Sequence, residues 1–223
     1  GLVVKTTLDL RIQNRLKDSM KEMFDSSVPT LAGFTNGAAT VEDTKTGQII
    51  AMQGSRDFNY PGYGQDNAAL AYIQPGSTIK PLVYSQLFSD QGGDKKNYGS
   101  GSILADDRSM NDIYGAPLKN ADNQFLGNIP IRKSLALSRN VPAVKAMYVA
   151  GVQPTLETIR AMGDKNYCTQ GADAQAGLSS AIGGCGTKQV DHVNAFATLG
   201  RQGVYKPTSS VLEVKNNQGE VLK

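Results

Sequence analysis

The chain has 223 residues, of which 39% are hydrophobic and 19% charged, a profile typical of globular domains. The formal net charge is only +3 and the basic residues are scattered, which argues against a nucleic-acid partner. No run approaches the roughly 18 apolar residues needed to cross a bilayer, and the first residues do not resemble a signal peptide. We therefore expect any export or anchoring element to lie outside this chain.

The first third of the chain predicts a helix followed by a hairpin. Apolar residues Ile12, Leu16 and Met20 have helical spacing, and Asp9 before them is a suitable N-cap. Residues 38–55 read as two strands joined by a turn at residues 45–47, where Gly47 suits the turn.

The rest of the chain predicts mainly helices. A helix is expected at 77–90, a second at 130–137, a third near Pro142 that Gly151 ends, and two more at 155–162 and 187–203. Residues 209–223 read as a hairpin. With strands near both ends and helices between, one α+β domain over residues 1–223 is the predicted fold.

The stretch "QPGSTIKP" at residues 74–81 places Ser77 three residues before Lys80. A proline is tolerated only in the first turn of a helix, so Pro81 fixes a helix start close to Ser77 and places Ser77 at or beside the N-cap. Residues three apart share a helix face, so the Lys80 amine is expected to reach the Ser77 hydroxyl. A partly desolvated lysine amine can take the proton of a serine nucleophile. A simple helix cap with a solvated lysine is the alternative.

A second candidate pair lies in "LALSRNVPAV". Ser138 and Asn140 fall between two predicted helices, because Pro142 is expected to open the second helix. A corner of this kind lets both side chains point into a cleft. The alternative is that both residues cap the following helix.

The two motifs in this order resemble the SxxK and SxN motifs of penicillin-binding protein transpeptidases, of the bifunctional class A type. The similarity extends to "VKTTLDLRIQ", "VEDTKTGQIIAMQGSRDFN", "RKSLALSRNVPAVK" and "VDHVNAFATLGRQGVYKP", and so covers almost the whole chain. The resemblance implies a serine β-lactamase/DD-transpeptidase-like α+β fold, with an antiparallel sheet packed with helices and an all-helical lobe.

The same resemblance implies a peptidoglycan DD-transpeptidase that uses no cofactor and no metal. Ser77 would form an acyl-enzyme with a stem peptide ending in D-Ala-D-Ala, or with a β-lactam antibiotic. Lys80 would be the base, Ser138 would relay a proton, and Asn140 would bind the substrate amide. The Ser77 backbone N–H would supply half of the oxyanion hole. The location implied is extracytoplasmic, with membrane anchoring through upstream regions of a longer parent protein.

The family's third motif, KTG, is expected downstream of Asn140, but the only copy lies upstream, at residues 45–47 in the predicted turn. We therefore expect this chain to be the N-terminal portion of a transpeptidase domain. The remainder is expected either as a companion fragment carrying KTG or as residues removed from the chain. By itself such a chain is expected to be an impaired enzyme.

Other interpretations remain open at this point. A β-lactamase or β-lactam-sensing module could share the SxxK scaffold, and a non-catalytic module could have kept only the fold. A Ser-His-Asp triad would need His192, the only histidine, which a helical context favours as structural. Cys168 and Cys185 form no metal-binding pattern; they could pair as a disulfide or remain as two thiols.

Overall fold

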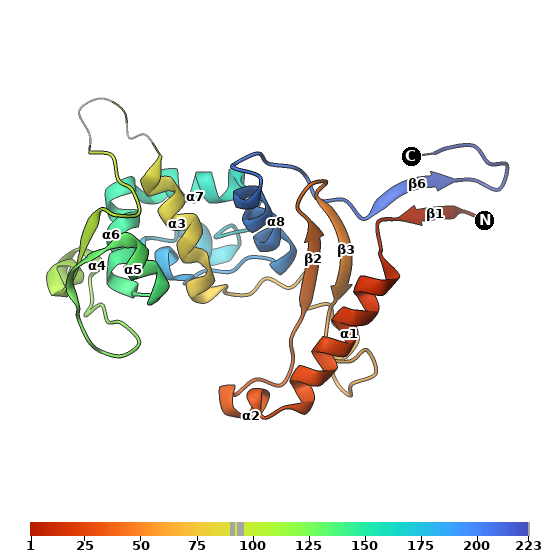
Figure 1. The fold of residues 1–223 in the computed structure, drawn as a ribbon, viewed down its shortest axis with the longest axis horizontal. Coiled ribbons are helices and arrows are strands. Elements are labelled where there is room, and N and C mark those ends of the chain that lie inside the picture. The colour runs from red at the N-terminus through yellow and green to blue at the C-terminus, as the bar shows by residue number, and fades with distance from the viewer. Residues whose placement is uncertain (90–91, 93–95, 223) are drawn as a thin grey trace. The chain divides into compact units, whose positions relative to one another are not determined.

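The computed structural model of the protein describes residues 1–89, 92 and 96–222 (Figure 1). It contains two compact units, Gly1–Ala71 with Lys188–Lys223, and Tyr72–Thr187. Both units combine helices with short antiparallel strand pairs, which confirms the α+β class. The single domain over residues 1–223 stays a prediction. None of the helices in the described residues is long and apolar enough to cross a membrane.

The first unit contains two antiparallel ribbons and the helices packed on them. The ribbons pair β1 (Val3–Thr6) with β6 (Val211–Lys215), and β2 (Ala39–Asp43) with β3 (Gln48–Gln53). The helices are α1 (Leu10–Asp25), α2 (Val28–Ala32) and α8 (Gln189–Gly200). In Figure 1, α1 runs beside β3, and α8 packs on β2.

Local sequence explains the helix start and the turn of this unit. The Asp9 carboxylate accepts hydrogen bonds from the N–H groups of Arg11 (2.9 Å) and Ile12 (3.4 Å), so the predicted N-cap is confirmed. The Asp43 carboxylate accepts from the Lys45 N–H at 2.9 Å, and Gly47 adopts φ +80°. The predicted turn at 45–47 is thus confirmed, since a positive φ favours glycine.

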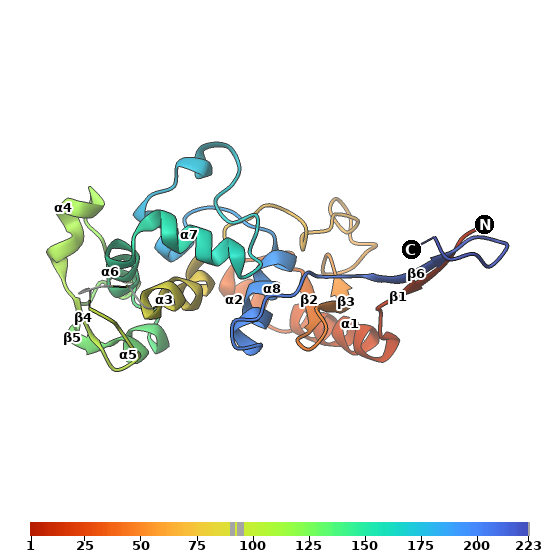
Figure 2. The same ribbon diagram turned by 90° about the horizontal axis from the view of Figure 1, so that it is seen from above.

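The second unit is mainly helical. Its helices are α3 (Lys80–Phe88), α4 (Asn111–Tyr114), α5 (Ile131–Ala136), α6 (Asn140–Ala150) and α7 (Val152–Ala161). Short 3₁₀ turns add η1 (Gly76–Ile79), η2 (Arg108–Met110), η3 (Gly171–Gln175) and η4 (Leu178–Ile182). Helix α3 packs on both α6 and α7 (Figure 2). Their shared core is fully buried and includes Leu82, Leu87, Val144, Met147 and Ile159.

Three helices in this unit have boundaries that differ from the predictions by two residues or more. The helix expected at 77–90 is the 3₁₀ turn η1 followed by α3, which ends at Phe88; residue 90 lies outside the described residues. Helix α6 begins at Asn140 rather than at Pro142, which still lies in the first turn. Helix α7 begins at Val152, three residues earlier than predicted, because Gly151 both ends α6 and precedes α7.

Two short strand pairings were not predicted. Strands β4 (Ile103–Asp106) and β5 (Gly127–Pro130) form an antiparallel ribbon inside the helical unit. The predicted C-terminal hairpin is reduced to β6 with one bridge between Lys215 and Val221, while β6 pairs mainly with β1. Strands of four or five residues with distant partners give too short an alternation to be recognised from sequence.

Candidate active site

Ser77 lies in the turn η1, immediately before helix α3, and its side chain is exposed. The predicted N-cap position is wrong by two residues: Pro75 precedes the 3₁₀ turn, and Ile79 is the N-cap of α3. In a 3₁₀ turn, residues three apart are eclipsed, so Ser77 and Lys80 still project from the same side of the chain. The sequence therefore predicted that Ser77 and Lys80 share one side of the chain, although the turn that joins them is a 3₁₀ turn, tighter than the expected α-helical turn.

Lys80 is fully buried, and its amine donates to three oxygen atoms. These are the carbonyl of Ser138 at 2.6 Å, the Ser138 hydroxyl at 3.2 Å and the Asn140 side-chain oxygen at 2.7 Å. The structure thus brings both predicted motifs together around one nitrogen atom. Within the described residues no hydrogen bond joins Lys80 to the Ser77 hydroxyl, so the direct contact expected from the spacing is not formed.

Burial is the main reason that the pKa of the Lys80 amine is lowered, from 10.5 to about 8, and the positive charge of Arg139 acts in the same direction. Removing an ammonium group from water disfavours its charged form, while a neighbouring cation repels it. An amine with a pKa near 8 is neutral in an appreciable fraction of molecules near neutral pH. It can therefore act as a proton acceptor there, which an ordinary lysine cannot do efficiently.

Ser138 is held in an unusual backbone conformation between α5 and α6. Its φ is +52°, in the left-handed region that a side chain rarely adopts and that costs roughly 1–3 kcal/mol. In this conformation both its carbonyl and its hydroxyl accept from Lys80, while its N–H donates to the Leu135 carbonyl at 3.0 Å. The corner predicted from "SRNVP" exists, although only Ser138 lies in it.

Asn140 is the first residue of α6, and its amide group bridges two parts of the unit. Its oxygen accepts from Lys80, and its nitrogen donates to the Lys119 carbonyl at 2.9 Å. The Asn140 backbone N–H donates to the Asn120 side-chain oxygen at 2.7 Å. In this structure Asn140 therefore orients the Lys80 amine, and contact with a substrate amide stays a prediction.

A buried polar network supports this corner, and sequence reasoning missed it. The Asp106 carboxylate accepts from the Arg139 guanidinium at 2.8 Å and from the Asn120 amide at 2.7 Å. Arg139 also pairs with Asp122 at 2.7 Å. Asp106, Asn120 and Arg139 are all at most 5% exposed. Arg139 lies between Ser138 and Asn140 in the sequence, and this place inside the motif was the one signal that could have identified it. The sequence around Asp106 and Asn120 gives no such signal.

The remaining sequence candidates fall elsewhere. The KTG copy at 45–47 forms the β2–β3 turn, where the Thr46 hydroxyl donates to Asp43 at 2.9 Å. His192 lies on α8 with its ring against Phe196, at 5.1 Å between ring centroids. Among the described residues, no three His, Cys, Asp or Glu side chains gather as metal ligands would. Cys168 and Cys185 form a disulfide, which settles the pairing that the sequence left open.

The chain is similar to a known protein family along most of its length, and to relatives of known name. The family described as penicillin binding protein transpeptidase domain matches residues 37–220. Penicillin-binding protein 1A/1B of Bacillus subtilis is 29% identical over 226 residues, covering 100% of this chain and 23% of that protein. Penicillin-binding protein 1A of Neisseria meningitidis is 29% identical over 177 residues, covering 79% of this chain and 21% of that protein. The chain thus spans only about a quarter of these relatives.

Solved structures of a penicillin-binding protein also resemble this chain. The penicillin-binding protein PonA1 from Mycobacterium tuberculosis superposes with a TM-score of 0.81 at 25% identity, over 100% of this chain and 57% of that one. The same protein in complex with penicillin V gives a TM-score of 0.73 at 25% identity, with the same coverage of both chains. The family match includes Ser77, Lys80, Ser138 and Asn140. The chain belongs to the penicillin-binding protein transpeptidase domain family.

Proposed function

We propose that this chain carries the acylation centre of a peptidoglycan DD-transpeptidase, with Ser77 as the nucleophile and Lys80 as its base. The observation on which this rests is the Lys80 amine: it is buried, has a lowered pKa, and is held by Ser138 and Asn140 one turn from an exposed serine. Both side chains of the SxN motif accept from this one amine, which fixes it beside the serine of the other motif.

The proposed reaction begins at the carbonyl carbon of the penultimate D-Ala of a stem peptide. The Ser77 oxygen attacks this carbon while its proton passes to the neutral Lys80 amine. The amide bond to the terminal D-Ala then breaks, and the leaving nitrogen takes a proton from Lys80 through the Ser138 hydroxyl, which lies 3.2 Å from the amine. The acceptor amine of a second stem then attacks the ester carbonyl carbon and loses its proton to the neutral Lys80 amine. The ester bond to the Ser77 oxygen breaks, and Lys80 returns the proton to that oxygen, which restores the Ser77 hydroxyl.

β-Lactams would acylate Ser77 by the same attack, because opening their ring amide likewise leaves an acyl ester on the serine. A relative of this chain is known in complex with penicillin V. A long-lived penicillin ester on Ser77 would favour the transpeptidase over a β-lactamase, which would hydrolyse the ester rapidly. We also propose that the domain acts outside the cytoplasm. The buried Cys168–Cys185 disulfide supports this location, since such bonds persist in oxidising compartments.

An exchange assay tests the proposal. The intact gene product that carries this chain is incubated with a peptide ending in D-Ala-D-Ala and a labelled D-amino acid as the acceptor amine. We expect release of D-Ala with incorporation of label, abolished by Ser77→Ala. Ser109→Ala, an exposed serine on η2, serves as the matched control and should react like the wild type. Equal incorporation by Ser77→Ala would overturn the proposal.

A further inference from the structure

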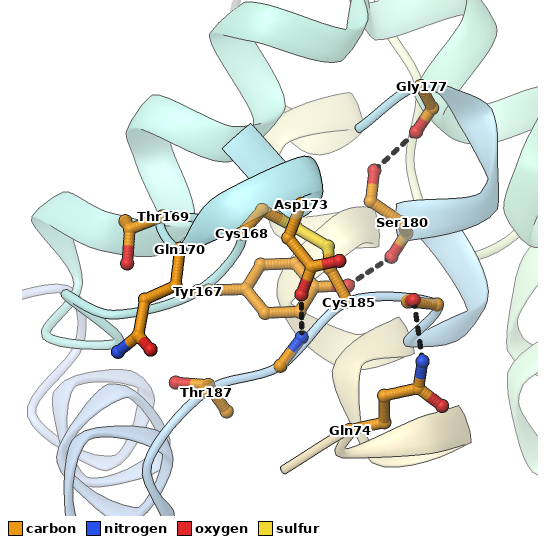
Figure 3. Close-up of a disulfide and its surroundings, with 12 residues drawn as sticks. Gln74, Tyr167, Cys168, Thr169, Gln170, Asp173, Gly177, Ser180, Cys185 and Thr187 are labelled. Carbon is orange, nitrogen blue, oxygen red and sulfur yellow. Dashed lines mark hydrogen bonds between the residues drawn. A yellow bond between two sulfur atoms is a disulfide. The ribbon is translucent and has the colours of Figure 1, made fainter. Parts of the chain in front are cut away.

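The disulfide closes a loop whose end packs against the chain that leads to Ser77. Cys168 and Cys185 are 17 residues apart in sequence, their Cα atoms lie 5.2 Å apart, and both residues are 1% exposed. The loop between them contains η3 and η4, and Figure 3 shows the disulfide beside the Tyr167 ring. Because the disulfide is buried, it fixes the end of this loop to the interior of the unit.

The end of the loop and the two residues after it, together residues 183–187, run alongside residues 73–76. Ile73 and Thr187 exchange backbone hydrogen bonds of 2.9 and 2.8 Å, and the Gln74 side chain donates to the Gly184 carbonyl at 2.8 Å (Figure 3). The segment that immediately precedes Ser77 is thus held along its length by the segment that contains Cys185.

The closest approach between these segments is backbone against backbone. A Cβ atom added to Gly183 would lie 2.2 Å from the Gly76 carbonyl oxygen and 2.4 Å from its Cα atom. Gly76 is the residue directly before Ser77, and it adopts φ +58°. Because no side chain separates the two backbones, a displacement of Gly183 cannot be absorbed by a rotamer change. It passes to Gly76 and so to Ser77.

Other contacts hold the loop without the disulfide. The Asp173 carboxylate accepts from the Gly186 N–H at 2.8 Å and from the Tyr72 hydroxyl at 3.0 Å. The Arg160 guanidinium donates to the carbonyls of Tyr167 and Cys168, both at 2.9 Å. Removing the disulfide is therefore expected to loosen the position of residues 183–186 while leaving the surrounding unit folded.

We propose that Cys168, Cys185 and Gly183 are positioning residues for the nucleophile: the disulfide holds Gly183 against Gly76 and thereby sets where Ser77 stands relative to Lys80. This inference rests on the proposed function of Ser77. A displacement of about 1 Å at a reacting atom can slow a reaction by about a hundredfold. Loss of this contact should therefore lower the acylation rate constant. It should change the dissociation constant of the complex that forms before acylation less.

The test measures the time course of acylation of the intact gene product by a fluorescent penicillin at several concentrations. This separates the acylation rate constant, the dissociation constant of the initial complex, and the fraction of active protein. The variants are Cys168→Ser/Cys185→Ser and Gly183→Ala. The matched control is Gly115→Ala, because Gly115 has nearly the same φ (+81° against +79°) but nothing within 4 Å of an added Cβ.

We expect the acylation rate constant to fall about ten- to a hundredfold in Gly183→Ala and at least severalfold in the double serine variant. Gly115→Ala should react like the wild type. A variant that is merely unstable would lower the active fraction and leave the rate constant of the remaining molecules unchanged. That result, or equal rate constants in all variants, would overturn this inference while leaving the proposed function intact. A wild-type protein that forms no adduct would overturn both.

Discussion

At the scale of single residues, the site depends on how one lysine is held. Lys80 is placed by its spacing from Ser77, but its chemistry is set by burial and by the three oxygen atoms around its amine. These oxygens stabilise the position of the nitrogen atom. Burial and the positive charge of Arg139 disfavour the ammonium form of the amine, and they therefore lower its pKa to about 8. The lysine is thus both fixed and readily deprotonated.

This arrangement predicts a pH dependence of acylation. Only the neutral amine can accept the Ser77 proton, so the rate should rise with pH and level off above the pKa. With a pKa of about 8, the neutral fraction, and hence the rate of penicillin acylation, should increase roughly tenfold between pH 7 and pH 9. The measurement is the acylation rate constant as a function of pH, with the spontaneous hydrolysis of penicillin subtracted. A rate that is flat or falls across this range would exclude Lys80 as the base.

At the scale of elements, the start of helix α6 carries the site residue Asn140 and is capped by a buried side chain. The Asn120 side-chain oxygen accepts from the N–H groups of Asn140 (2.7 Å) and Val141 (3.3 Å), which are unpaired within the helix. The Asn120 nitrogen donates to Asp106, which in turn pairs with Arg139. A single buried amide thus joins the cap of α6 to the ion pair that Asp106 of β4 forms with Arg139, the middle residue of the SRN motif.

Asn120→Asp tests this network with almost no change in shape. The substitution keeps the oxygen that caps α6, but places a second carboxylate 2.7 Å from Asp106 in place of a donor. We expect a loss of at least about 2 kcal/mol in the free energy of unfolding at pH 7, because a buried hydrogen bond is replaced by repulsion. The loss should shrink as the pH falls towards about 5, where the pair can share a proton.

Denaturant unfolding at both pH values measures this effect. Asn128→Asp, the same change at an exposed position of β5, is the control and should alter the unfolding free energy by less than about 0.5 kcal/mol. An Asn120→Asp protein as stable as this control would show that the network contributes little.

The same elements show what the sequence could and could not predict. Ser77, Lys80, Ser138 and Asn140 were all predicted, because proline positions and short spacings are local signals. The meeting of Ser138 and Asn140 at the Lys80 amine was not predicted, since these hydrogen bonds join residues about 60 positions apart. Asp106 and Asn120 could not be predicted, because they act through β4 and a loop that show no local pattern.

At the scale of the whole molecule, the four predicted site residues lie in one compact unit, Tyr72–Thr187, together with the disulfide. The proposed nucleophile, base and proton relay, and the segment proposed to position Ser77, therefore belong to one packed unit. Long-range contacts inside this unit, rather than any single element, bring the site together. The KTG motif that the family resemblance implies downstream of Asn140 stays a prediction.

The central claim is that Ser77 is the residue that becomes acylated. The most direct measurement is peptide mapping by mass spectrometry of the intact gene product after reaction with penicillin. We predict one adduct per chain, on the peptide that contains Ser77, and none in Ser77→Ala. An adduct on another residue, or one that persists in Ser77→Ala, would contradict the account.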